Sequence, residues 1–304
     1  MSESEQFPLV PSEGHELARI PDQEENAIVK RMVQDVAIRL DVDTPLDEKG
    51  CTPLMRAVIE GDVAKVKQFI ALKAKVNIAD NEGRTALLLG AEISHAEIVK
   101  LLLDHGADVN LGEGALLCRA AKSGRSDIMK LLFDRGADIN TSGGTALMSA
   151  AYDGYLETVK FLLDCGVDVN TKGEFGSALV EASRRGHWDI MKLLLAAGAD
   201  VHAADSEGRT ALWWVIGFRY PEEYNKTTRT EIVRLLLAHG AEVNFVITYG
   251  NGNTPLIQAA DRGHLDIVEM LVASGANIGS QNLRGHSALM FASGTGHLDI
   301  VKSL

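Results

Sequence analysis

The sequence predicts an all-α solenoid, in which helix-turn-helix units stack in a row and project short β-hairpin or loop fingers. Two repeating motifs predict this class. A Thr/Ser–Pro/Ala–Leu start recurs with steps of 33, 30, 30, 32, 33, 44 and 33 residues. A second motif keeps the same phase, from EIVKLLLDHGADVN at 97–110 to EIVRLLLAHGAEVN at 231–244. Two motifs in phase indicate repeated structural units rather than chance similarity.

The start motifs define eight repeats, numbered here 1 to 8, that cover residues 47–304. They begin at Thr52, Thr85, Ala115, Thr145, Ser177, Thr210, Thr254 and Ser287. One helix pair alone cannot bury its apolar faces, whereas stacked neighbours can bury them against each other. We therefore expect one long array rather than separate globular domains.

Each repeat contains the signals for two helices. A Thr or Ser hydroxyl can cap the first helix, and Pro is tolerated in its first turn. A glycine such as Gly186 then permits a turn, and apolar residues at helical spacing, such as Ile98, Leu101 and Leu102, predict a second helix. A second glycine, such as Gly198, is typical of a left-handed helix end. A polar segment follows and is expected to form the finger.

These motifs resemble the ankyrin repeat family. The resemblance rests on the period near 33, the Thr-Pro-Leu start, the Gly-His before the second helix and the Gly-Ala-Asp-Val-Asn ending. It implies L-shaped units of two antiparallel helices with a hairpin finger. It also implies binding of partner proteins on the concave side, without enzymatic activity.

Several positions depart from the family pattern. The family usually has His after the start motif, but here that position holds Met55, Leu88, Cys118, Met148, Val180, Trp213, Ile257 and Met290. The seams between repeats are therefore expected to be more apolar. Lys73 stands where the helix-ending glycine belongs, which predicts strain of about 1 kcal/mol. The fingers at 110–115, 140–145 and 170–177 are short, which predicts a shallower groove there.

Repeat 6 carries an insertion between its helices, FRYPEEYNK at 218–226. Insertions in solenoids map to loops on one face, and the Phe and two Tyr could anchor a partner. The alternative is a tolerated loop whose aromatic residues pack back onto the solenoid edge, and this is the interpretation we favour.

The two ends of the chain differ in character. Residues 1–21 are predicted to be an acidic, disordered tail. Residues 22–46 carry a capping box at Asp22 and Glu25 and an apolar stripe at helical spacing, which predicts a capping helix or half-repeat. A partner-binding amphipathic helix is the alternative. The sequence stops inside the second helix of repeat 8, so we expect an uncovered apolar face and a chain that continues in the natural protein.

Composition and motifs argue against several classes of function. The net charge is -12 and no basic stripe occurs, so nucleic-acid binding is not expected. No apolar run is long enough to span a membrane, and three scattered cysteines favour a reduced, intracellular, cytoplasmic protein. His95, His187, His264 and His297 occupy one position of different repeats, too far apart to share a metal ion. We expect no catalytic residues and no cofactor.

The candidate site is therefore a surface. The fifth residue of each start and a pair further along the first helix should face the concave side. We expect a monomer that binds other proteins there through the residues Tyr152, Arg184, Arg185, Trp214, Phe218 and Arg262. An ordinary mixed surface, with Trp214 packed on Trp213, is the alternative. For function, the alternative is a targeting or regulatory arm of a larger enzyme or effector.

Overall fold

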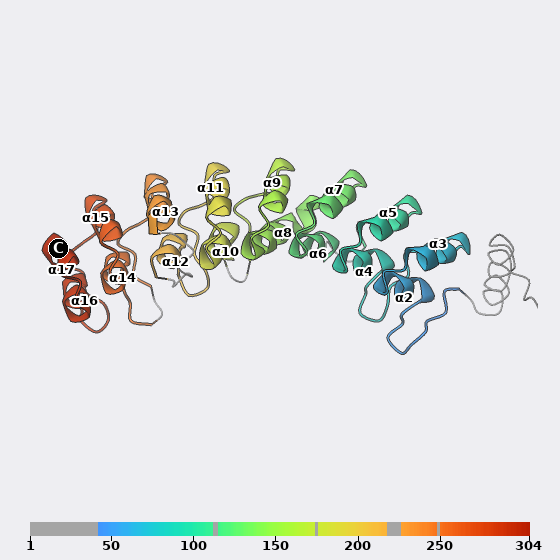
Figure 1. The fold of residues 1–304 in the computed structure, drawn as a ribbon, viewed down its shortest axis with the longest axis horizontal. Helices are drawn as coiled ribbons and strands as arrows, with labels where there is room; N and C mark the ends of the chain where they lie inside the picture. The colour runs from blue at the N-terminus through green and yellow to red at the C-terminus, as the bar shows by residue number, and fades with distance from the viewer. Residues whose placement is uncertain (1–41, 112–114, 174–175, 218–225, 248–249) are drawn as a thin grey trace, which may run out of the picture.

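The computed structural model describes residues 42–111, 115–173, 176–217, 226–247 and 250–304. In these residues, pairs of helices follow one another and stack in sequence order into one curved solenoid (Figure 1). The first helix of each pair lies on the inner side of the curve and the second on the outer side (Figure 1). This arrangement confirms the predicted all-α solenoid.

Every repeat contributes one inner and one outer helix. The inner helices are α2 (Pro53–Ile59), α4 (Ala86–Glu92), α6 (Ala115–Lys122), α8 (Ile139–Asp153), α10 (Ala178–Arg185), α12 (Ala211–Gly217), α14 (Pro255–Arg262) and α16 (Ala288–Thr295). The outer helices are α3 (Val63–Ala71), α5 (Ala96–Asp104), α7 (Ser126–Asp134), α9 (Leu156–Asp164), α11 (Trp188–Ala196), α13 (Lys226–Ala238), α15 (Leu265–Ala273) and α17 (Leu298–Ser303).

The start motifs cap the inner helices as predicted in most repeats. The hydroxyls of Thr52, Thr85, Thr210, Thr254 and Ser287 each accept a hydrogen bond from the backbone N–H three residues on. Ser177 occupies the same position but makes no such bond. Thr145 lies inside α8 and therefore caps nothing. The predicted capping role is wrong at these two positions.

Glycines end the helices with positive φ, as predicted, at both turns of the repeats. Lys73 adopts the left-handed conformation of the missing glycine, with φ 64. Ser94 replaces the glycine between the helices of repeat 2 and has φ 59. A side chain is strained in this region, so repeats 1 and 2 each contain one strained residue.

The fingers form short antiparallel contacts. In the finger before repeat 5, β1 (Lys172–Gly173) pairs with β2 (Gly176–Ser177). Single bridges close three others: Ala79 with Thr85, Ala204 with Thr210, and Gln281 with Ser287. The short finger expected at 140–145 is absent, because α8 begins at Ile139 and runs through the start motif. Few residues connect the helices there, and a helix satisfies their backbone hydrogen bonds internally.

Asparagines link neighbouring fingers. Asn77 donates to the carbonyl of Gly106 over 3.0 Å and accepts from the backbone N–H of Asp108 over 2.9 Å. Asn110, Asn170 and Asn244 make the same pair of bonds to the next repeat. His202 occupies this position at the end of repeat 5. Its backbone N–H donates to Asp200 of its own finger, as those of Asn110 and Asn170 do to Asp108 and Asp168, but the described residues show no corresponding bonds from its side chain to the next repeat. The seam between repeats 5 and 6 therefore differs from those flanked by asparagine.

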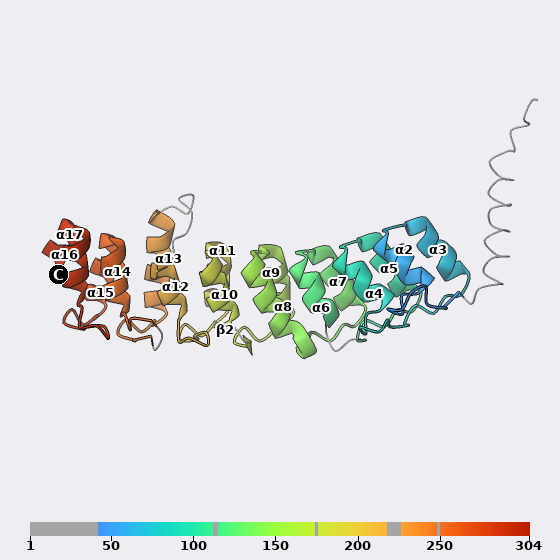
Figure 2. The ribbon, with the colours of Figure 1, turned by 90° about the horizontal axis from the view of Figure 1, so that it is seen from below.

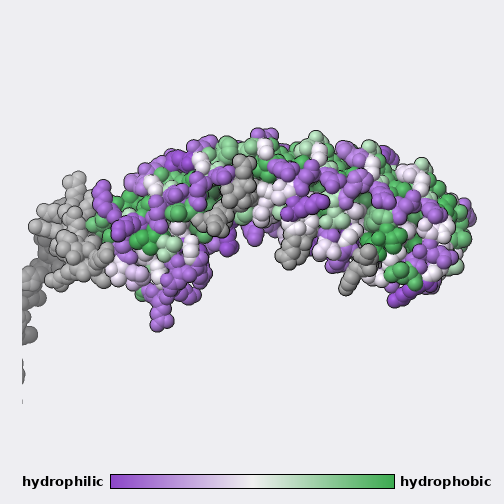
Figure 3. All heavy atoms as spheres, turned by 180° about the vertical axis from the view of Figure 1, so that it is seen from behind, coloured by the Kyte–Doolittle hydropathy of each residue, from purple (hydrophilic) through white to green (hydrophobic). Residues whose placement is uncertain are grey.

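The core is continuous from repeat to repeat. The leucine of each start motif is buried in repeats 1 to 7, as are apolar residues of the outer helices such as Ile98, Leu102 and Leu194. At the C-terminal end, apolar surface gathers at the tip of the arc (Figure 3). The exposed large apolar residues there are Leu283, Leu289, Met290 and Leu298.

Three predicted regions lie wholly or partly outside the described residues. They are the acidic tail at 1–21, residues 22–41 of the expected N-terminal helix, and most of the insertion in repeat 6. The helix that follows the insertion, α13, is described and has 13 residues, whereas α11 has nine. Figure 2 shows α13 extending beyond the row formed by the other outer helices. Across the described residues, no helix is both long and apolar enough to cross a lipid bilayer.

Candidate functional site

A groove of about 730 Å³ lies on the inner side of repeats 3 to 5. It is lined by residues of α6, α8 and α10 and by the finger before repeat 5: Lys122, Thr145, Met148, Ser149, Tyr152, Asp153, Gly173, Glu181 and Arg184. Several of these come from the positions that the sequence assigns to the concave side. The lining residues come from three consecutive repeats, so the groove spans the seams between them.

Tyr152 brings three of the predicted site residues together. The Arg184 guanidinium lies 4.9 Å from the centre of the Tyr152 ring, and the Arg185 guanidinium lies 4.5 Å from it. Tyr152 comes from α8, whereas both arginines end α10, so the cluster spans the seam between repeats 4 and 5. Stacking on a ring face attracts a cation and restricts its motion.

Glu181 is a buried carboxyl group in the wall of the groove. Its Oε2 atom lies 2.9 Å from Nη2 of Arg184. Burial raises the pKa of Glu181 above its ordinary value, and the nearby Arg184 opposes this shift only in part. Arg184 is thus held between a carboxylate and an aromatic ring, which fixes its position in the groove.

Trp214 lies deeper than the sequence predicts. The motif places it on the concave side with Arg56 and Arg119, but only 7% of its surface is exposed. Its Nε1 donates to Oδ2 of Asp205 over 3.2 Å, and Arg209 stacks on its ring at 4.4 Å. Trp213 packs edge-on against it, as the alternative interpretation expects. Trp214 therefore supports the finger before repeat 6.

The two remaining candidates lie further along the array. Arg262 ends α14 and is half-buried. Phe218 lies outside the described residues, and so do the other aromatic residues of the insertion. The structure thus gathers Tyr152, Arg184 and Arg185 at one place and leaves Arg262 in repeat 7.

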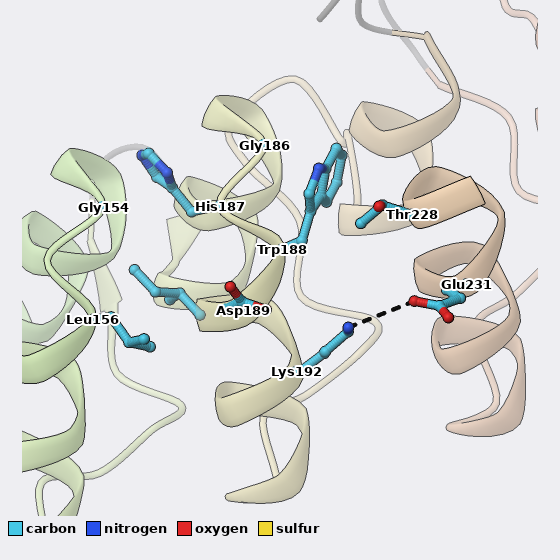
Figure 4. A pocket seen from close by; sticks show the side chains of 10 residues that line it. Gly154, Leu156, Gly186, His187, Trp188, Asp189, Lys192, Thr228 and Glu231 are labelled. Atoms are coloured by element: carbon cyan, nitrogen blue, oxygen red, sulfur yellow. Dashed lines mark ion pairs between the residues drawn. The ribbon is translucent and has the colours of Figure 1, made fainter. Parts of the chain in front are cut away.

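A second pocket, which the sequence does not predict, lies among the outer helices. It has a volume of about 450 Å³ and is lined by residues of α9, α11 and α13. Figure 4 shows the Trp188 indole between α11 and α13 near Thr228, and the ion pair of Lys192 with Glu231 at 3.6 Å. Trp188 is buried, although Leu298 at the same position of repeat 8 is exposed. In the sequence, only the large side chain of Trp188 and the extra length of repeat 6 could have indicated this pocket.

The repeated histidines and glycines form contacts between repeats. The His187 ring lies directly over Gly154 of the preceding repeat, and the His297 ring lies over Gly263. A Cβ at either glycine would overlap the ring. The His187 Nε2 atom also lies 3.0 Å from the carbonyl oxygen of Tyr152. His95, His187, His264 and His297 each occupy the N-cap position of an outer helix, which confirms their assignment as helix-start residues.

At the seam of repeats 2 and 3, Arg125 occupies the position of these histidines and makes the contact between the two repeats. Its Nη1 donates to the carbonyl of Ser94 over 2.5 Å. Its Nε and Nη2 atoms bind the carboxylate of Asp127 over 2.9 and 2.6 Å. This seam therefore joins an arginine to a serine where others join a histidine to a glycine.

Comparison with known proteins gives matches that agree with this geometry. The family model of ankyrin repeats in three copies matches residues 18–113, 111–173 and 222–304, and that of many copies matches 162–212. The chicken Arf-GAP with coiled-coil, ANK repeat and PH domain-containing protein 2 is 47% identical over 53 residues, which is 17% of this chain and 7% of the relative. Mouse ankyrin repeat domain-containing protein 63 is 36% identical over 85 residues, covering 28% of this chain and 20% of that protein.

A bacterial relative is also similar. The putative ankyrin repeat protein YahD of Escherichia coli is 39% identical over 54 residues, covering 18% of this chain and 27% of its own length. All of these matches span well under two thirds of the relatives. The family models, by contrast, extend over most of the sequence, and the helix pairs stack in the same order as the matched repeats. The chain therefore belongs to the ankyrin repeat family.

Proposed function

We propose that this chain is a non-enzymatic scaffold that binds a partner protein on its concave side. The observation that carries the proposal is the groove of repeats 3 to 5, where Tyr152 stacks on Arg184 and Arg185. Tyr and Arg often dominate the binding energy of protein interfaces. Ankyrin repeats are typically protein-binding modules, which supports the same function.

The individual residues have different roles in this proposal. Tyr152 and Arg185 contact the partner directly, and Glu181 holds Arg184 in place. Trp214 acts indirectly, because it is buried and positions Arg209 and the finger at Asp205. Arg262 extends the surface into repeat 7, and Phe218 remains a predicted contact.

Site-specific cross-linking tests the location of binding. A photo-reactive amino acid at Ser149, within the groove, should cross-link a partner protein in cells of the source organism. The control places the same amino acid at Lys130, an exposed residue of the outer helix α7. A partner captured from Lys130 and not from Ser149 would contradict binding in the groove.

A second function is supported by the relatives themselves. The matched segments cover small parts of longer proteins, whose names include an Arf-GAP and a probable E3 ubiquitin-protein ligase. We propose as the alternative that the repeats form a targeting or regulatory arm of a larger enzyme or effector. A reading frame that continues past residue 304 into a domain without repeats would favour this alternative, and a stop codon there would exclude it.

A further inference from the structure

Two cations at the inner face of repeats 3 to 5 form no ion pair within the described residues. Lys122 ends α6 and Arg185 ends α10, and both side chains are exposed. The neighbouring arginines do form such pairs: Arg119 pairs with Glu92 over 3.2 Å, and Arg184 pairs with Glu181 over 2.9 Å. Lys122 and Arg185 can therefore bind an incoming carboxylate without first breaking an ion pair.

Arg185 is also held in place before any ligand binds. Its guanidinium carbon lies 4.5 Å from the centre of the Tyr152 ring, and this cation–π contact restricts the side chain. An arginine can bind a carboxylate through two parallel hydrogen bonds. Restricting the side chain beforehand lowers the entropy lost on binding.

Repeat 4 places the opposite charge between these two cations. Asp153 lines the same groove, is exposed, and forms no ion pair among the described residues. Lys122 and Asp153 line the groove, and Arg185 contacts Tyr152, which also lines it. The charges without an ion pair are therefore positive in repeat 3, negative in repeat 4 and positive in repeat 5. A ligand of complementary charge carries acid, base and acid in the same order.

The spacing of the repeats selects the conformation of such a ligand. Packed helices lie about 8–10 Å apart. A polyproline II chain advances about 3.1 Å per residue with three residues per turn, so it presents one residue every 9 Å or so on the same side. Residues i, i+3 and i+6 of the ligand would then face repeats 3, 4 and 5.

We propose that the groove binds an extended, predominantly acidic segment of the partner protein, with carboxylates at i and i+6 and a basic residue at i+3. The proposal rests on the proposed function, and it names the chemistry of the partner. Arg185 and Lys122 bind the two carboxylates, and Asp153 binds the central cation.

A short synthetic peptide tests this pattern. Glu-Pro-Pro-Lys-Pro-Pro-Glu, blocked at both ends, has the proposed charges, favours the polyproline II conformation and reads the same in both directions. The control is Lys-Pro-Pro-Glu-Pro-Pro-Lys, in which every charge is reversed. Binding is followed by NMR of ¹³C-labelled methionine methyl groups. Met148 lines the groove, and Met191 is buried in the outer helix α11 as an internal reference.

The acidic peptide should shift the Met148 signal and leave Met191 unchanged, and it should bind at least about tenfold more tightly than the reversed peptide. Arg185→Gln should weaken it about tenfold. The matched control is Arg234→Gln, which removes an exposed arginine from the outer helix α13. Equal or tighter binding of the reversed peptide, no binding of the acidic peptide, or equal losses in both variants would overturn the proposal.

The result separates this proposal from the proposed function. If Ser149 cross-links a partner protein but Met148 responds only to the reversed peptide, binding in the groove stands and the acidic ligand is rejected. If Ser149 gives no cross-link while Lys130 does, the groove itself is rejected.

Discussion

Repeats 7 and 8 share the start motif and the GHLDIV junction but have very different surroundings. Leu256 in repeat 7 is 1% exposed, whereas Leu289 at the same position of repeat 8 is 43% exposed. The next residues follow the same pattern, with Ile257 at 0% and Met290 at 55%. The motif is common to both repeats, so burial is produced by the neighbouring repeat and not by the unit itself. In a solenoid, stability is shared across seams.

The largest expected effect comes from truncating the same leucine in the two repeats. Leu256→Ala should lower the free energy of unfolding by about 3 kcal/mol, because it leaves a cavity in a covered seam. Leu289→Ala should cost less than about 1 kcal/mol, because its side chain is already partly in water. Urea denaturation followed by circular dichroism measures both, and equal losses would show that the two surroundings are energetically alike.

Finger-to-finger hydrogen bonds allow a second comparison, between the seams on either side of repeat 5. Asn170→Ala removes two bonds to repeat 5, so it should lower stability by about 2 kcal/mol. His202→Ala should change it by less than about 0.5 kcal/mol, since its side chain makes no corresponding bonds. Denaturation midpoints of the two variants test this, and a larger loss at His202 would contradict the described geometry.

The strained helix ends offer a smaller effect of opposite sign. Lys73→Gly should raise stability by about 1 kcal/mol, because glycine adopts a positive φ without strain. Gly106→Ala, at the same position of repeat 2, should lower it by about the same amount. Differential scanning calorimetry of both variants checks the signs. A loss of stability in Lys73→Gly would mean that the side chain contributes more than the strain costs.

The smallest expected effect is a pH dependence of stability at the seam between repeats 4 and 5, where His187 lies. Burial lowers the pKa of His187, assisted by Arg185 and opposed by the Tyr152 carbonyl and Asp153. Because the folded pKa is below the unfolded value of about 6.5, the contribution of His187 is fully present above that pH and is lost as the pH falls towards the folded pKa. Melting temperatures of the wild type and His187→Gln should therefore converge in acid. A constant difference from pH 5 to 8 would contradict this.

The periodic features of the fold could be predicted from the sequence, because each follows from a local requirement. The left-handed turns, most of the caps and the strain at Lys73 depend on a few neighbouring residues. Failures occurred where the finger before the start motif itself takes up secondary structure. Ser177 belongs to a finger strand, and α8 absorbs its short finger, although both contain the usual start motif.

The candidate site was predictable to a lesser extent. The order of the repeats places Tyr152 beside Arg184 and Arg185, so their proximity could be anticipated. The burial of Trp214 could not, because it depends on Asp205 and Arg209, which the finger brings onto the ring. The pocket beside Trp188 depends on the longer helix α13, whose length could not be inferred from the insertion.

The contact of His187 with Gly154 has a consequence for how arrays of this type can change in length. Repeat 4 carries both halves of such a contact: Gly154 meets the His187 ring of repeat 5, and the Tyr155 ring meets Gly124 of repeat 3. A duplicate of repeat 4 would therefore place Tyr155 beside Gly154, a glycine-to-ring contact of the kind that already joins repeats 3 and 4. The seam between repeats 2 and 3 is different, because Arg125 donates to the carbonyl of Ser94 there. A duplicate of repeat 2 alone would place His95 beside Ser94, so the copy would lack this joint.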